Sequence, residues 1–175
     1  QWQPALSISM GDAQIVEGDV GVATMVFALT LSGIGIGDAT VEYATADQSA
    51  VAGPDYIQAK GKIVFAPGET SKLINIQALG DLIDENDEQF VVKLANAEGA
   101  SIATPSAIGT IVDDDGRPSI QIHDAEVMEG DSGLTKLAFR ITLDGPSGKT
   151  VRADYSTIDG TAVAPADYVS ASGEI

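Results

Sequence analysis

Large apolar residues alternate with polar or small ones along most of the first 115 residues. The clearest run covers residues 25–31, where every second position is large and apolar: Met25, Phe27, Leu29 and Leu31. Such alternation is typical of a strand with one face on a core and the other in water. Runs of this kind predict seven strands, at residues 6–10, 24–31, 40–44, 62–65, 72–79, 89–94 and 107–112.

Turn-forming residues separate these runs, as at Gly53-Pro54 and Pro67-Gly68, and no segment favours a long helix. Seven short strands in a unit of about 100 residues predict an all-β fold, a seven-stranded antiparallel immunoglobulin-like β-sandwich. A closed barrel is the alternative. The side chains expected inside the sandwich are Phe27, Leu29, Tyr43, Ile74, Phe90 and Val92.

The pattern repeats at one fixed offset of 112 residues. Val16-Glu17-Gly18-Asp19 returns as Met128-Glu129-Gly130-Asp131, and Asp55-Tyr56 returns as Asp167-Tyr168. Repetition at a fixed offset indicates tandem copies of one structural unit. We therefore expect a complete unit one at residues 1–115, a short linker at 116–118 and the N-terminal half of unit two at 119–175.

The chain is strongly acidic, since its 175 residues include 26 Asp and Glu against 9 Lys and Arg, for a formal net charge of −17. This charge argues against a nucleic-acid partner, because binding phosphates requires a basic surface. No apolar run is long enough to span a bilayer, so we expect no direct membrane insertion.

The residue inventory also argues against an enzyme. Cys is absent and His occurs once, which excludes thiolate zinc sites and cysteine catalysis and makes a Ser-His-Asp triad hard to build. A carboxylate pair could in principle hydrolyse a sugar, but aromatic residues, which make up 5% of the chain, are too few for a sugar platform. We expect no catalytic activity.

Acidic residues concentrate in the predicted loops rather than in the strands. Alternate connections of a sandwich lie at the same end, so the loop after the third strand, the loop before the sixth and the exit of the seventh can meet. Like charges gathered there repel one another unless a cation neutralises them. Abundant oxygen ligands without His or Cys suit a hard ion, and calcium fits better than magnesium. A merely solvated acidic surface is the alternative.

Several motifs together resemble the Calx-beta domain over essentially the whole chain. They are Val16-Glu17-Gly18-Asp19, Tyr43-Ala44-Thr45-Ala46-Asp47, Phe65-Ala66-Pro67-Gly68-Glu69-Thr70, the acidic run 81–90 and Asp113-Asp114-Asp115. That family occurs as regulatory calcium-sensing domains of sodium/calcium exchangers, in an integrin beta subunit and in tandem arrays of extracellular and bacterial surface proteins.

The resemblance implies a set of calcium ligands. They are the side chains of Glu17, Asp47, Asp81, Glu85, Glu88, Asp113, Asp114 and Asp115, with the backbone carbonyl of Ile83. Gly80 departs from the family pattern, because exchanger domains with several calcium sites have an acidic ligand at that position.

Two functions remain open at this point. The first is a calcium-binding module of a larger multidomain protein, whose ions rigidify tandem units for calcium sensing or cell-surface adhesion. The second is a calcium-independent spacer or adhesion module. The expected partners are calcium ions, adjacent tandem modules and, through the open edges of unit two, a second copy of the chain. The expected location is extracellular or on a bacterial surface, with a cytoplasmic regulatory domain of a membrane protein as the alternative.

Overall fold

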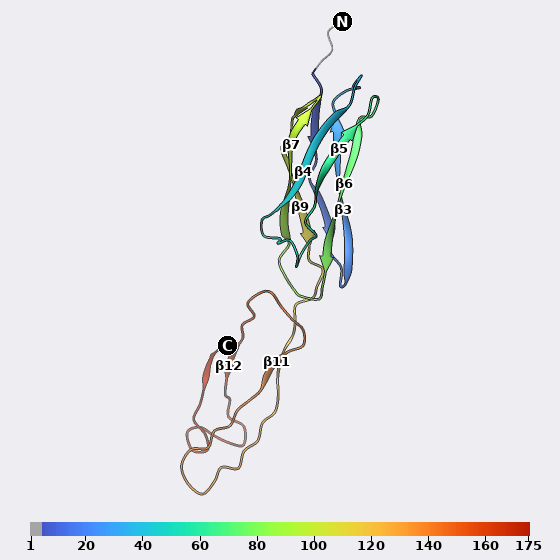
Figure 1. The fold of residues 1–175 in the computed structure, drawn as a ribbon. Coiled ribbons are helices and arrows are strands. Elements are labelled where there is room, and N and C mark those ends of the chain that lie inside the picture. Colours follow the sequence, from blue (N-terminus) through green and yellow to red (C-terminus); the bar gives the residue numbers. More distant parts are fainter. Residues whose placement is uncertain (1–4) are drawn as a thin grey trace. The chain divides into compact units, whose positions relative to one another are not determined.

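The computed structural model describes residues 5–175, which form two compact units that divide between Gly116 and Arg117. The first four residues of the predicted unit one lie outside the described residues. Every regular element in residues 5–175 is a β-strand (Figure 1). No helix long and apolar enough to cross a membrane occurs among these residues.

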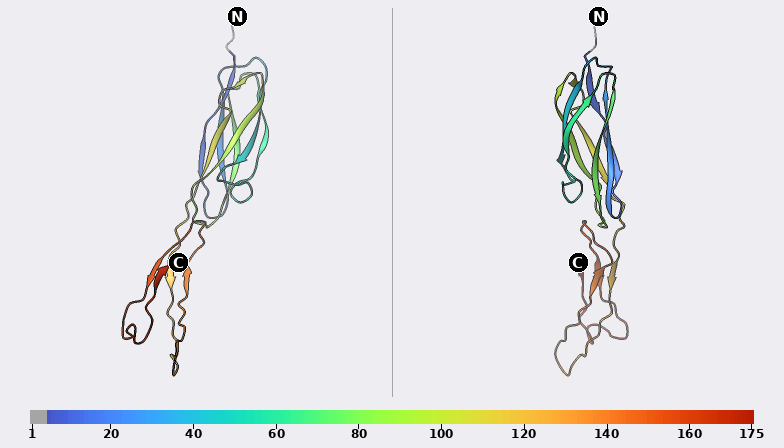
Figure 2. Two further views of the ribbon diagram at one scale, coloured as in Figure 1. Left: turned by 90° about the vertical axis from the view of Figure 1, so that its left-hand side faces the viewer. Right: turned by 45° about the vertical axis from the view of Figure 1, so that its right-hand side comes forward.

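Unit one is built from two sheets that face each other as layers (Figure 2). In the order β6-β3-β1-β8, the first sheet consists of Ser71–Gly80, Gly21–Leu31, Ser7–Met10 and Ser101–Ile102. In the order β2-β9-β7-β4-β5, the second consists of Ala13–Val16, Ser106–Val112, Glu88–Glu98, Ala39–Asp47 and Lys60–Phe65. The predicted all-β sandwich is confirmed.

The core lies between the two sheets, where the alternating apolar residues meet. Phe27 of β3 pairs in register with Ile74 of β6, and both are buried. Phe90 of β7 packs edge-to-face on Phe27, with 6.0 Å between ring centroids, and stacks on Tyr56 at 4.3 Å. Of the residues predicted inside, Tyr43 alone is half-buried; the others are buried.

The structure adds two strands, β2 and β8, to the seven predicted, and each pairs in parallel with its neighbour. The first predicted strand ends at Met10, and after Gly11 and Asp12 the chain crosses to the other sheet as β2. The Asp12 carboxylate accepts a 2.7 Å hydrogen bond from the Ile108 amide of β9, which fixes this crossing. The sandwich is therefore antiparallel except at these two short pairs.

Unit two has four short strands in two separate antiparallel pairs. β10 (Ile120–Ile122) pairs with β11 (Ile141–Leu143), and β12 (Asp154–Ser156) pairs with β13 (Ser172–Glu174). None of residues 117–175 is buried. Phe139, the counterpart of Phe27, is 51% exposed, whereas Phe27 is fully buried.

Candidate metal centre

The parallel pairing of β2 with β9 brings the first acidic motif to the last one. Val16 and Val112 are partners at the ends of these strands, so both chains leave the sheet at the same end. Glu17 follows Val16, and its amide donates a 3.2 Å hydrogen bond to the Val112 carbonyl. Asp113 follows Val112. Residues nearly 100 positions apart thus become neighbours because the strands run in the same direction.

Three carboxylates converge at this end of unit one. Glu17, Asp113 and Asp115 are half-buried, and one oxygen of each lies within 4.8 Å of the others. Oδ2 of Asp115 is buried without a hydrogen-bond partner, which a protein rarely tolerates. Asp114 instead uses its Oδ1 to accept a 3.0 Å hydrogen bond from the Gly18 amide. An oxygen-only group with an unsatisfied buried oxygen fits a hard cation such as calcium.

Glu17 experiences the repulsion of this cluster. Burial, followed by the charges of Asp81, Asp113, Asp115 and Glu85, raises its pKa to about 7. Burial and the neighbouring Asp113 also raise the pKa of Asp115. A cation bound here would relieve both the repulsion and the loss of hydration.

The loop after β6 contributes the next predicted ligands. Asp81 and Glu85 lie close enough to Glu17 for their charges to raise its pKa. Oδ1 of Asp81 accepts a 2.7 Å hydrogen bond from the Ile83 amide, which closes a tight turn in the loop. The carbonyl of Ile83 as a ligand stays a prediction.

Glu88, at the start of β7, forms a second acidic group with Asp55. A hydrogen bond between the two side chains, together with burial, raises the pKa of Glu88 to about 7, with burial as the larger cause. The charge of Glu85 raises the pKa of both Glu17 and Glu88, so Glu85 interacts with both acidic groups. The predicted set of calcium ligands does not include Asp55. Its recurrence in the Asp55-Tyr56 and Asp167-Tyr168 pairs was the available signal.

Asp47 lies outside the group of three convergent carboxylates. It is the last residue of β4, and its Oδ1 accepts hydrogen bonds from the Tyr56 hydroxyl at 2.5 Å and from the Ala52 amide at 3.0 Å. Its assignment as a ligand stays a prediction.

Gly80 is an integral part of the site's geometry. It ends β6 opposite Gly21, and a Cβ atom on it would lie 1.9 Å from the Gly18 carbonyl oxygen and 2.7 Å from that of Glu17. No side chain fits there while the turn at Glu17 and Gly18 keeps its position. This close backbone packing explains why a glycine occupies position 80, where the resemblance would place an acidic ligand.

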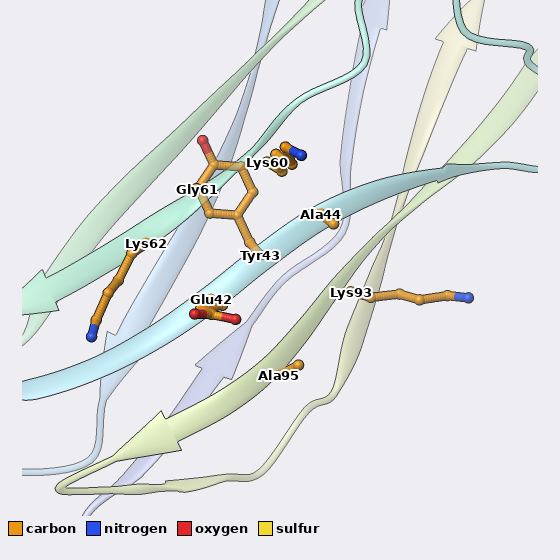
Figure 3. Close-up of a pocket in the computed structure, with 8 residues that line it drawn as sticks. All are labelled: Glu42, Tyr43, Ala44, Lys60, Gly61, Lys62, Lys93 and Ala95. Carbon is orange, nitrogen blue, oxygen red and sulfur yellow. The ribbon is translucent and has the colours of Figure 1, made fainter.

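A hollow of about 530 Å³ lies elsewhere, over strands β4, β5 and β7 (Figure 3). Its charged residues are Glu42, Lys60, Lys62 and Lys93. Three ammonium groups repel a cation, so this hollow does not compete with the carboxylate cluster as a calcium site.

Comparison with known proteins decides the family. The Calx-beta domain model matches residues 3–115 and, as a second segment, residues 113–175. The chain belongs to the Calx-beta family. Human sodium/calcium exchanger 2 is 33% identical over 172 residues, which covers 87% of this Calx-beta chain but 18% of the exchanger. The chain thus spans less than a fifth of that relative's length.

Solved Calx-beta structures are similar in fold. CBD12 from CALX1.2 is 26% identical, with a TM-score of 0.58 and coverage of 97% of this chain and 70% of that one. The calcium binding domain CBD12 of CALX1.1 is 30% identical, with a TM-score of 0.55 and coverage of 63% and 44%. The resemblance inferred from the motifs is therefore confirmed.

Proposed function

We propose that this chain is a calcium-binding regulatory module of a larger protein, and that calcium binds at the end of unit one where Glu17, Asp113 and Asp115 converge. The observation that carries the proposal is this half-buried group, with all three carboxylates within 4.8 Å. Concentrating negative charge in a partly buried place is unfavourable unless a cation is bound. The calcium-binding domain of a related protein supports the choice of ion.

The remaining predicted ligands belong to the same proposal. Asp81, Glu85 and Glu88 would complete the coordination from the loop before β7, with Asp47, Asp114 and the Ile83 carbonyl as further contributors. Glu17, Asp113 and Asp115 would hold the ion, and its charge would neutralise them. Because Asp115 lies two residues before the start of the second compact unit, an ion there would order the chain that leads into it.

Calcium sensing is favoured over adhesion as the role of the module. Human sodium/calcium exchanger 2, which matches over 87% of the chain, is an ion transporter rather than an adhesion protein. The same relative favours a regulatory domain of a membrane protein over a cell-surface location. The role is non-enzymatic: the module binds an ion and changes its own rigidity.

Urea unfolding in calcium and in chelator tests the proposal. A ligand that binds only the native state adds about 2.7 kcal/mol of stability at a hundredfold excess over its dissociation constant. We expect unit one to gain stability of this order, and calorimetry to detect calcium binding directly. No heat and no gain in stability at millimolar calcium would refute the proposal.

The repeat supplies a matched pair of variants for the site. Glu17→Gln removes a carboxylate of the cluster and should weaken calcium binding by about tenfold or more, whereas Glu129→Gln alters its counterpart in unit two and should leave the affinity unchanged. Asp115→Asn should act like Glu17→Gln. Equal effects of Glu17→Gln and Glu129→Gln would place the ion elsewhere.

A further inference from the structure

We propose that Tyr56 is a positioning residue for the candidate calcium site, acting through two predicted ligands, Asp47 and Glu88. The inference rests on the calcium binding proposed above and concerns a residue outside the predicted ligand set. Tyr56 is fully buried, and it connects the ends of two strands that carry those ligands.

The hydroxyl of Tyr56 fixes Asp47. It donates a 2.5 Å hydrogen bond to Oδ1, and the Ala52 amide donates to the same oxygen at 3.0 Å. Two donors on one oxygen determine the rotation of the carboxylate, and neither of them uses Oδ2. A tyrosine hydroxyl keeps its proton at neutral pH, so it acts as the donor in this bond. Asp47 is thus held in one orientation with Oδ2 left for an ion.

The ring of Tyr56 fixes the start of β7. It stacks on Phe90 with an interplanar angle of 14°, and Phe90 comes two residues after Glu88 and is the register partner of Asp47. The neighbouring Asp55 shares a hydrogen bond with Glu88. The Tyr56 side chain therefore contacts both paired strands where the predicted ligands lie, through its hydroxyl on Asp47 of β4 and through its ring on Phe90 of β7.

The same loop is anchored to the other sheet. The Leu79 amide of β6 donates to the Asp55 carbonyl at 2.9 Å, and the Ile57 amide donates to the Gln77 carbonyl at 2.8 Å. Tyr56 cannot shift without disturbing these bonds.

Unit two repeats the hydrogen bond between the tyrosine hydroxyl and the aspartate, but it does not repeat the contacts with Phe90 and Glu88. The Tyr168 hydroxyl donates to Oδ1 of Asp159 at 2.7 Å, and the Ala164 amide donates to the same oxygen at 3.0 Å. Residues 119–175 correspond to residues 7–63, so no counterpart of Glu88 or Phe90 is among them. The tyrosine–aspartate hydrogen bond joins residues nine positions apart in both units. In unit one the tyrosine also contacts the strand that carries Glu88, and residues 119–175 contain no equivalent of that strand. Tyr168 is therefore a natural control.

The test compares Tyr56→Phe with Tyr168→Phe in the full chain. Phenylalanine keeps the ring and its stack on Phe90 but removes the donor to Asp47. Loss of a group that orients a metal ligand typically weakens metal binding about 10- to 100-fold, so we expect calorimetry to report at least a tenfold higher calcium dissociation constant for Tyr56→Phe. The calcium dissociation constant of Tyr168→Phe should stay within about twofold of that of the unmodified chain, because Tyr168 orients no predicted ligand.

Urea unfolding separates positioning from a purely structural role. A structural role lowers stability equally in calcium and in chelator and leaves the dissociation constant unchanged, and that result would overturn the inference. In an Asp47→Asn background, Tyr56→Phe should have a much smaller effect on affinity, because the two residues act on one contact. An unmodified chain that binds no calcium would overturn the proposed function together with this inference, whereas normal binding by Tyr56→Phe would overturn this inference alone.

Discussion

Units one and two share a pattern of apolar residues, but these side chains are mostly buried in unit one and exposed or half-buried in unit two. Phe27 and Phe139 occupy the same position of the repeat, yet Phe27 is fully buried and Phe139 is 51% exposed. The difference arises because β6, which pairs with β3 beside Phe27, and β7 and β9 of the opposite sheet come from residues 71–112, which have no counterpart among residues 119–175. Alternation assigns a residue to a face, but burial requires the opposite sheet.

The largest expected difference between the units is in the cost of truncating this aromatic residue. Phe27→Ala should reduce the free energy of unfolding of unit one by about 3 to 5 kcal/mol, because it leaves a cavity in a packed core. Phe139→Ala should change stability by less than about 1 kcal/mol, because an exposed ring leaves no cavity. Urea unfolding followed by circular dichroism measures both, and similar losses would show that the two positions are packed alike.

A smaller difference is expected at a glycine that both units place beneath a tyrosine. A Cβ on Gly61 would lie 2.8 Å from the Tyr43 ring, and one on Gly173 would lie 3.0 Å from the Tyr155 hydroxyl. Tyr43 packs against the core, whereas Tyr155 is 42% exposed and can turn away. Gly61→Ala should cost about 1 to 3 kcal/mol and Gly173→Ala less than about 1 kcal/mol. Equal costs in urea unfolding would contradict the comparison.

The smallest expected effect is a pH dependence that Glu17 gives to unit one. Folding raises the pKa of Glu17 from its ordinary 4.5 to about 7, so the folded state binds more protons than the unfolded state between these values. Stability in chelator should therefore fall as the pH rises from about 4.5 to about 7 and then level off. Solvent screening of a partly buried group limits this contribution to about 1 kcal/mol.

Glu17→Gln isolates that contribution. The difference in unfolding free energy between this variant and the unmodified chain should change across the same pH range, and saturating calcium should reverse the trend, since the ion favours the ionised carboxylate. A Glu17→Gln variant with an unaltered pH profile in chelator would show that Glu17 ionises normally in the fold.

The sequence predicts the fold well wherever period-two alternation is strong. Residues 24–31 and 72–79 have that pattern, and they form the long pair of β3 and β6. Ala13–Val16 does not have it, because it is four residues long and lacks a clear alternation of large side chains, so β2 was not predicted. Its parallel pairing with β9 depends on the chain crossing between sheets at Gly11 and Asp12, which local sequence does not encode.

The site was predicted by resemblance more than by geometry. Glu17, Asp113 and Asp115 come together as a result of the unpredicted β2–β9 pairing, so local pattern alone gave no distance between them. The contact of Asp55 with Glu88 and that of Tyr56 with Asp47 were not predicted, because each joins residues of different loops through tertiary packing. The ligand roles of all nine predicted residues, including the three that converge, stay predictions.

Strand β5 has a consequence for how copies of this molecule meet. It is the outermost strand of the five-stranded sheet and pairs within that sheet with β4 alone. Lys60 and Lys62 project from its outer face (Figure 3). Two copies joined edge to edge through β5 would bring four ammonium groups side by side, a repulsion that natural sheets use against runaway fibre growth. In an otherwise acidic chain, the two lysines on this outermost strand therefore disfavour edge-to-edge pairing of copies through β5.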